Sequence, residues 1–297
     1  MSTTHQGPDL DSDLTGKTVV ITGASSGIGA TAARRLARRG ATVIAVGRSP
    51  ERTAAVAAEL GTEPVIGDFA RLDDVERVAA ELTARLPRID VLANNAGGVF
   101  GDPTKTVDGF ERTFQINHLA PFLLTHLLMD ILTASGASVL QTSSVAARRP
   151  AKVVIEDLNL DRNFSPIRAY GAAKLANILF TQELHRRFHA RGVSSAAFHP
   201  GNVATRFGSQ SRSRLMKFIT TNPVTRGMLI TPEKGSDHLV WLAGSRAGAD
   251  WDSGTYYEKF RPSRSVNPQA RDAELARQFW EKSQQLLGDR LPVAVQD

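Results

Sequence analysis

The sequence predicts a single α/β domain built on a doubly wound parallel sheet with helices on both faces. Short apolar runs bounded by turn residues alternate along the chain with longer segments of helical periodicity. The 297 residues are enough for one large core, and no repeat or Pro/Gly-rich linker divides them. We expect a flexible N-terminal tail at 1–14, the domain at 15–290 and a short C-terminal tail at 291–297.

The first elements form a βαβ unit: a strand at 17–22, a helix at 27–39 and a second strand at 41–46. Further strands are expected at 64–66, 89–93, 138–142 and 193–198. Two stretches, 145–168 and 206–231, break this alternation. Long connections in compact domains are usually lids or binding loops. We therefore expect 206–231 to be a substrate lid, with a peripheral helical insertion as the alternative.

Composition is that of an ordinary globular protein, with 41% hydrophobic and 22% charged residues. Because the chain has no cysteine, a disulfide framework and thiolate metal sites are excluded, and no metal is expected. Residues 1–14 lack the basic start and apolar run of a secretory signal. The longest apolar stretch, 119–132, is too short to span a bilayer. The expectation is a cytoplasmic protein without a membrane anchor.

The formal net charge of +6 raises the question of an anionic macromolecular partner. Four arginines, Arg34, Arg35, Arg38 and Arg39, share one predicted helix, but the other basic residues are scattered and no aromatic residues alternate with them. This distribution indicates solvated helix faces, so we expect no binding of nucleic acid.

A glycine-rich turn, TGASSGIG at 22–29, follows the first strand and opens the first helix. Glycines allow a tight turn and a close approach of the main chain, and a helix N-terminus offers unpaired N–H groups to a pyrophosphate. A Rossmann-type dinucleotide site is expected here; taken alone, the turn would also suit a plain strand-to-helix connection. Its cofactor-binding residues would be Gly23, Ser25, Ser26, Gly27, Ile28 and Gly29.

This turn resembles the opening motif of the short-chain dehydrogenase/reductase family, and further motifs follow in the family's order over roughly 14–287. They are Asp68 after the third strand, the Asn-Asn-Ala-Gly run at 94–97 after the fourth, and Asn117 in the next helix. Taken alone, an aspartate in such a place is also typical of a helix N-cap and an asparagine of a turn.

The resemblance implies a role for each of these motifs. Asp68 and Phe69 would approach the adenine, Asn95, Ala96 and Gly97 would line the cofactor, and Asn117 would hold a water in a proton relay. The Pro-Gly-x-Val-x-Thr segment after the sixth strand would contact the carboxamide end of the nicotinamide through Pro200, Gly201, Val203 and Thr205. His199, just before this segment, is expected to be structural.

The end of the second strand indicates the cofactor. Rossmann proteins that use NAD place a carboxylate there on the ribose hydroxyls. This chain has Gly47 and then Arg48, a cation that can pair with a 2′-phosphate. The pattern predicts a preference for NADP(H) over NAD(H); a surface arginine at a turn is the alternative.

Tyr170 and Lys174 are four residues apart at the start of a predicted helix, so their side chains share a face. Their place beyond the fifth strand matches the family's Tyr-x-x-x-Lys motif, which implies that Tyr170 exchanges the proton and Lys174 holds the nicotinamide ribose. A nearby ammonium and the positive charge of the nicotinamide are expected to lower the pKa of the phenol. Ser144 matches the family's carbonyl-orienting serine, with Ser143 as the alternative.

The 26 positions between Ser144 and Tyr170 contain an insertion that resembles the retinol dehydrogenase-like branch of the family, as do the run at 174–184 and Gly254-Thr255-Tyr256-Tyr257. The implied activity is NADPH-dependent reduction of a hydrophobic ketone or aldehyde, or oxidation of a secondary alcohol. A non-catalytic NADP(H)-sensing protein of the same fold is the alternative. Family members commonly form homodimers or homotetramers, often through the segment 119–132.

Overall fold

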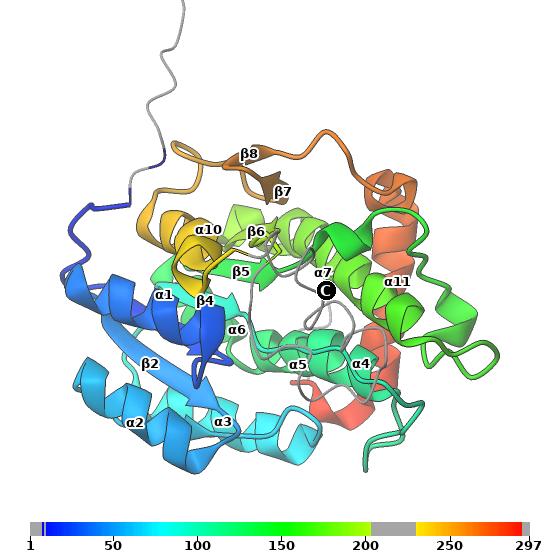
Figure 1. Cartoon of the computed structure of the whole chain (residues 1–297), viewed down its shortest axis with the longest axis horizontal. Helices are drawn as coiled ribbons and strands as arrows, with labels where there is room; N and C mark the ends of the chain where they lie inside the picture. The colour runs from blue at the N-terminus through cyan, green and yellow to red at the C-terminus, as the bar shows by residue number, and fades with distance from the viewer. Residues whose placement is uncertain (1–7, 9, 203–229, 293–297) are drawn as a thin grey trace, which may run out of the picture.

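The computed structural model describes residues 8, 10–202 and 230–292. Its centre is an eight-stranded sheet in the order β3-β2-β1-β4-β5-β6-β7-β8 (Figure 1). Neighbouring strands are parallel except β7 and β8, which are antiparallel. The strands are β1 (Thr18–Thr22), β2 (Thr42–Gly47), β3 (Val65–Ile66), β4 (Val91–Asn94), β5 (Ser138–Thr142), β6 (Ser194–Phe198), β7 (Thr255–Glu258) and β8 (Arg261–Pro262). The predicted doubly wound sheet is confirmed.

Helices cover both faces of the sheet. They are α1 (Gly27–Arg38), α2 (Pro50–Leu60), α3 (Leu72–Arg85), α4 (Arg112–Phe114), α5 (Ala120–Leu127), α6 (Met129–Ser135), α7 (Pro166–Phe188), α10 (Pro232–Gly244) and α11 (Ala273–Leu287). A π-helical turn, η1 (Gln115–Leu119), joins α4 to α5. The short 3₁₀ turns are η2 (Val145–Ala147), η3 (Ile155–Asp157), η4 (His189–Arg191), η6 (Pro268–Arg271) and η7 (Gly288–Arg290).

The two-residue alternation of the strands produces two apolar cores. Val20, Ile44 and Val46 face α3, α5, α7 and α11 on one side of the sheet. Val19 and Ile21 face α1, α2 and α10 on the other. Because successive side chains of a strand point to opposite faces, strands covered on both sides must be apolar throughout, as β1 and β2 nearly are.

Helix α11 covers the helix that family resemblance had suggested as a subunit interface. Every residue of α5 from Ala120 to His126 is buried. His118 Nε2 lies 2.8 Å from Ser283 Oγ on α11, and the rings of Phe122 and Trp280 are 4.9 Å apart. The chain's own C-terminal helix therefore occupies this face of α5, and an interface along 119–132 stays a prediction for the other residues of the segment.

The end of the expected N-terminal tail is docked onto the domain. Leu14 is buried and its N–H donates to the Arg39 carbonyl at 2.7 Å. The Ser12 hydroxyl donates to the Gly244 carbonyl at 3.1 Å. Among the described residues of 1–14, Ser12 and Leu14 are therefore part of the fold rather than of a tail, because the buried Leu14 side chain and these hydrogen bonds hold them.

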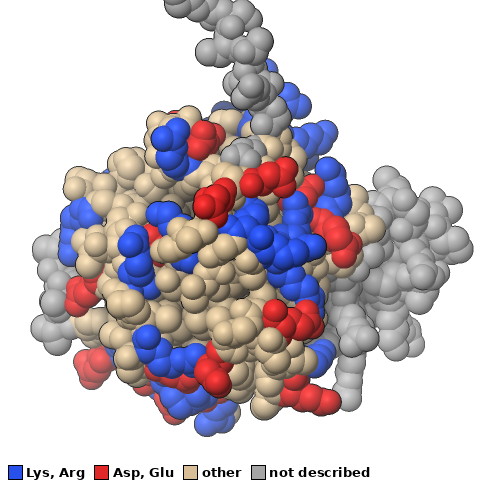
Figure 2. Space-filling model, turned by 90° about the vertical axis from the view of Figure 1, so that its left-hand side faces the viewer, with Lys and Arg blue, Asp and Glu red and all other residues tan. Residues whose placement is uncertain are grey.

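The arginines of α1 are used inside the fold. Arg34 pairs with Glu59 of α2 through two hydrogen bonds, and Arg35 pairs with Asp237 of α10 at 2.6 Å. Figure 2, which views the left-hand side of Figure 1, shows basic and acidic side chains intermixed on this face. These pairs agree with the prediction that the positive charge is distributed over helix surfaces.

Among the described residues, no single helix is long and apolar enough to cross a membrane; only the bent pair Arg112–Leu127 and Met129–Ser135 passes such a test by length and composition.

Candidate active site

The predicted motifs meet at one edge of the sheet, where the parallel strands β1, β4, β5 and β6 end. Between β1 and β4 the strand order reverses. Crevices beside such a reversal, at the carboxyl ends of parallel strands, are where α/β proteins bind ligands. The chain therefore brings its glycine turn and its Tyr-Lys helix to the same edge.

The glycine turn is packed tightly enough to require its glycines. A Cβ on Gly23, whose φ is +68°, would lie 2.8 Å from the Ala96 Cα atom, and one on Gly29 would lie 2.5 Å from the Gly23 oxygen. Gly27 also has a positive φ, of 58°. Ser26 is the N-cap of α1 but makes no side-chain cap, and the first turn has no acidic residue. The N-terminus of α1 thus keeps the positive character that suits a pyrophosphate.

Asn95 ties three strands together. Its side-chain amide donates to the Thr22 carbonyl at 3.0 Å and its side-chain oxygen accepts from the Thr142 hydroxyl at 3.3 Å. The Thr22 hydroxyl oxygen in turn accepts the N–H groups of Asn95 and Ala96, both at 3.0 Å. Since its side chain is used in these bonds, the lining of a cofactor site here falls mainly to the main chain at Ala96 and Gly97.

The adenine-side residues have different environments. Asp68 is half-buried and its carboxylate accepts the Ala70 N–H at 3.0 Å. The ring of Phe69 is 5% exposed and lies in the core. The ring is therefore not available to an adenine, and any approach by Phe69 is limited to its main chain.

No side chain fits at Gly47 without a rearrangement. A Cβ there would lie 2.4 Å from the Thr53 hydroxyl oxygen. Thr53 is fully buried and its hydroxyl donates to the Ser49 carbonyl at 2.7 Å. Steric exclusion by α2 thus keeps a carboxylate out of the position that would receive ribose hydroxyls, while Arg48 beside it is exposed.

Helix α7 carries the predicted Tyr-Lys pair. It begins at Pro166, a residue suited to a first helical position. Lys174 is 1% exposed, its Nζ atom donates to the Thr142 carbonyl at 2.9 Å, and it lies 5.5 Å from the centre of the Tyr170 ring. The four-residue spacing brings the two side chains together as predicted.

The two adjacent serines have separate roles. The Ser143 hydroxyl is buried and donates to the Lys174 carbonyl at 2.7 Å. Ser144 is the N-cap of η2, and its hydroxyl is hydrogen-bonded to Tyr170. The geometry favours Ser144 over Ser143 as the serine that meets a substrate oxygen.

Burial controls the titration of the pair. It raises the pKa of Tyr170 to about 12, although the hydrogen bond with Ser144 acts in the opposite direction. Burial also lowers the pKa of Lys174 to about 7. In the protein alone the pKa of the phenol is thus raised and not lowered, because the same burial disfavours both charged forms. The lowering expected with a nicotinamide charge beside the phenol stays a prediction. At neutral pH Tyr170 carries its proton.

Asn117 lies in the π-helical turn η1, a conformation found often at functional sites. Its amide donates to the carbonyls of Gly98 at 3.0 Å and Thr113 at 2.8 Å, and its oxygen accepts the Gly98 N–H at 3.2 Å. A Cβ on Gly97 would lie 2.4 Å from this oxygen and 3.2 Å from Lys174 Nζ. Asn117 holds the 97–98 loop against Lys174, and its role toward a water stays a prediction.

The nicotinamide-side segment is described only in part. Gly201 has a φ of +91°, and a Cβ on it would lie 2.5 Å from Ile230 Cδ1. Pro200 is buried. Burial lowers the pKa of His199 to about 4, so it is neutral at pH 7. Val203, Thr205 and the expected lid, except for Ile230 and Thr231, lie outside the described residues.

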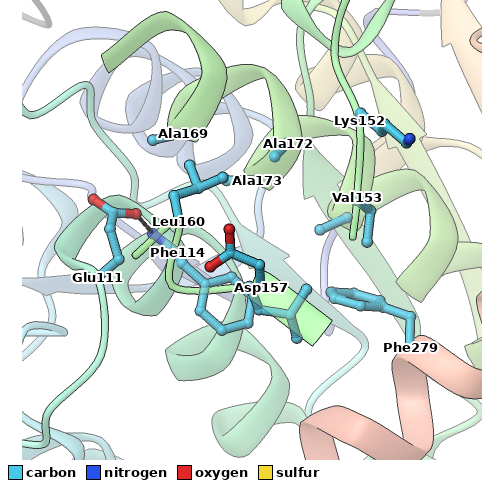
Figure 3. Close-up of a pocket in the computed structure, with 12 residues that line it drawn as sticks. Glu111, Phe114, Lys152, Val153, Asp157, Leu160, Ala169, Ala172, Ala173 and Phe279 are labelled. Atoms are coloured by element: carbon cyan, nitrogen blue, oxygen red, sulfur yellow. Dashed lines mark hydrogen bonds between the residues drawn. The ribbon is translucent and has the colours of Figure 1, made fainter. Parts of the chain in front are cut away.

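A pocket of about 310 Å³, open mouth included, lies beside this site (Figure 3). Its wall includes Ala169 and Ala173, each one residue before a member of the Tyr-Lys pair, so it borders a neighbouring face of α7. Glu111 at its edge is buried, which raises the pKa of its carboxyl, and it accepts the N–H groups of Thr113 and Phe114. The pocket contains neither Tyr170 nor Ser144.

Across the described ranges, no group of three or more His, Asp and Glu side chains could hold a metal ion.

Comparisons with known proteins agree with this geometry. The model of the family described as short chain dehydrogenase matches residues 17–215. A predicted daunorubicin C-13 ketoreductase of Streptomyces sp. strain C5 is 44% identical over 284 residues, which are 93% of this chain and 94% of that protein. Human retinol dehydrogenase 13 is 36% identical, over 94% of this chain and 87% of its own.

The fold comparison agrees as well. The crystal structure of an uncharacterised protein from Mycobacterium paratuberculosis superimposes with a TM-score of 0.75 at 31% identity. The match covers 97% of this chain and 100% of that one.

Proposed function

The chain belongs to the short-chain dehydrogenase/reductase family, and from that premise we propose that it is an NADPH-dependent reductase of hydrophobic ketones or aldehydes. Members of this family are NAD(P)-dependent oxidoreductases that act on C=O and CH–OH groups. The observation that carries the proposal is the convergence of Ser144, Tyr170 and Lys174 at the edge of the sheet that also bears the glycine turn.

The residues present fit a bound dinucleotide. The uncapped N-terminus of α1 would hold the pyrophosphate, and Lys174 the nicotinamide ribose. The exclusion of a side chain at Gly47 and the exposed cation of Arg48 support a 2′-phosphate and hence NADP(H). NADPH, when bound, supplies the hydride.

The protein's own chemistry is proton transfer and charge stabilisation. Burial keeps Tyr170 protonated, so it is ready to act as the general acid toward a developing alkoxide. The Ser144 hydroxyl, already bonded to Tyr170, would donate to the same oxygen as its charge grows. The protonated phenol is the form that reduction requires, and its phenolate would be the base in the oxidising direction.

The substrate class is proposed from two supports. The names of two relatives refer to a ketone of daunorubicin and to retinol. The chain also carries apolar residues between Leu215 and Ile230 directly after the nicotinamide segment, where a substrate wall is expected.

We expect the purified protein to oxidise NADPH in the presence of bulky apolar ketones or aldehydes, with weaker turnover of small ones. The measurement is the loss of NADPH absorbance across a panel graded by size, with each carbonyl compound omitted in turn as the control. NADPH binding without turnover of any compound would favour the alternative, a protein that senses NADP(H).

Replacing Arg48 with alanine is expected to weaken NADPH binding by about tenfold to a hundredfold and NADH binding very little. The 2′-phosphate is the only group that distinguishes the two cofactors, and charge-assisted hydrogen bonds contribute on the order of 1.5–3 kcal/mol. Fluorescence titration of both cofactors measures the two effects. Arg52→Ala, an exposed arginine of α2, is the control. Equal losses for both cofactors would assign Arg48 a structural role.

A further inference from the structure

Four polar side chains outside the predicted catalytic and cofactor-binding residues gather at the carboxyl ends of β6 and β7. They are Arg148 after η2, His199 after β6, and Tyr256 and Glu258 on β7, and we refer to them as the β7 cluster. Arg148 and Glu258 form an ion pair in which the carboxylate side chain is 12% exposed. Glu258 also influences the titration of His199 and Tyr256, so the four groups lie close together.

The ion pair connects strand β7 to the turn that carries Ser144. Arg148 follows Ser144 by four residues, and its N–H donates to the Val145 carbonyl within the same turn at 3.0 Å. The other side of this turn packs on α7, where a Cβ on Gly171 would lie 2.9 Å from the Ala146 oxygen. The Ser144 turn is thus held between α7 and β7, and Arg148 is its attachment to β7.

The hairpin turn after Glu258 has a strained backbone that contacts with His238 hold in place. Glu258 pairs with Arg261, which leaves Lys259 and Phe260 as a two-residue turn with φ values of 52° and 61°. Residues other than glycine rarely adopt such angles. His238 Nε2 accepts the Phe260 N–H at 3.1 Å and its ring stacks on that of Phe260 with centres 4.2 Å apart. Strain that is held in place by such contacts is typical of functional segments.

The cluster also contains buried polar atoms that the described part of the chain leaves without a hydrogen-bond partner. They are His199 Nδ1 and Arg148 Nε, while the Tyr256 hydroxyl is hydrogen-bonded to the Glu258 side chain. Buried polar atoms in proteins are nearly always hydrogen-bonded, so two such atoms in one cluster are hard to explain by stability alone. Burial, followed by the charge of Glu258, raises the pKa of Tyr256. The cluster reaches Tyr170 through the Ser144 turn, because Arg148 belongs to that turn and the Ser144 hydroxyl is hydrogen-bonded to Tyr170.

We propose that Glu258 is a positioning residue for carbonyl reduction: with Arg148 and Tyr256 it holds the hydroxyls of Ser144 and Tyr170 in the arrangement that a substrate oxygen meets. The inference rests on the proposed function and adds Arg148 and Glu258, which belong to none of the motifs of the sequence analysis, to the site. It differs from a purely structural ion pair, whose loss would lower stability without a selective effect on the chemical step.

The kinetic test is Glu258→Gln, which keeps the shape of the side chain and removes its charge. We expect kcat to fall by about tenfold to a hundredfold, since small displacements of catalytic groups have effects of that size. The KM for the ketone and the affinity for NADPH should stay within about twofold. Glu274→Gln, which breaks an exposed arginine pair on α11, is the matched control. Equal kcat in wild type and Glu258→Gln would overturn the proposal.

A double-mutant cycle shows whether the ion pair acts as a unit. Arg148→Met and Glu258→Gln should each lower kcat, and the combined variant should lose little more than either alone. Fully additive losses would mean that Glu258 does not act through Arg148, and would overturn the proposed linkage to Ser144.

A second readout does not depend on turnover. The chain has three tyrosines, so labelling their ring ¹³Cζ atoms gives three NMR signals that Tyr→Phe variants assign. Glu258→Gln should shift the signals of both Tyr256 and Tyr170. Tyr257, whose hydroxyl oxygen accepts the Asp252 N–H at 2.7 Å, should not change. An unchanged Tyr170 signal would overturn the proposal even if the wild type reduces ketones. A wild type without turnover would overturn only the proposed function.

Discussion

Replacing Tyr170 with phenylalanine is expected to lower the rate of ketone reduction by about 10²–10⁴-fold while NADPH affinity stays nearly constant. The substitution keeps the ring and removes only the hydroxyl that donates the proton. Because burial raises the pKa of Tyr170 to about 12, the phenol is protonated at neutral pH, and its loss removes the acid itself rather than a minor ionisation state.

The measurement is single-turnover reduction at saturating NADPH and ketone, with NADPH affinity determined separately. Tyr257→Phe is the matched control, since that ring packs in the core on the opposite face of the sheet. A Tyr170→Phe variant with near-wild-type turnover would remove Tyr170 from the acid role and leave Ser144 as the candidate proton donor.

Periodicity predicted most of the sheet because six strands are apolar runs that end at turn residues. Periodicity did not predict β7 and β8, because these two strands are not apolar runs. Thr255–Glu258 carries polar residues at both ends, and Arg261–Pro262 contains a proline, so neither is apolar enough to be recognised locally. Pairing with β6 makes β7 a strand, and such long-range pairing is not visible in a local pattern.

The candidate site likewise combines features that the local sequence predicts with features that only the fold creates. Spacing alone brings Tyr170 and Lys174 onto one helix face, since that property is local. The pKa directions depend on how deeply α7 is buried between the sheet and α11, which no motif contains. Arg148 and Glu258 are 110 positions apart, and their pairing follows from the fold. A serine-rich strand end likewise could not show that Ser143 is used by the Lys174 carbonyl.

Lys174 presents the clearest conflict between stability and function. Its ammonium group is 1% exposed, and burial lowers its pKa from 10.5 to about 7. The unfolded chain therefore binds more protons than the folded chain between these two pH values. The contribution of Lys174 to the free energy of unfolding is therefore largest above pH 10.5. It falls as the pH is lowered and reaches its minimum below about pH 7.

Replacing Lys174 with methionine is therefore expected to abolish most turnover and to raise Tm at neutral pH. Each pKa unit corresponds to about 1.4 kcal/mol, and the hydrogen bond to the Thr142 carbonyl that methionine loses offsets about 1–3 kcal/mol. The net gain is roughly 2–4 kcal/mol, and each kcal/mol corresponds to about 2–4 °C in Tm.

Thermal unfolding of both proteins across the interval from pH 7 to 10.5 measures this effect. The advantage of the methionine variant should be largest at pH 7 and should shrink as the pH approaches 10.5, where the neutral lysine of the wild type keeps its hydrogen bond at no cost. Lys152→Met, at an exposed lysine, should show no such trend. Parallel curves for wild type and Lys174→Met would mean that the buried ammonium is not penalised, and that the site tolerates its charge through a partner other than the Thr142 carbonyl.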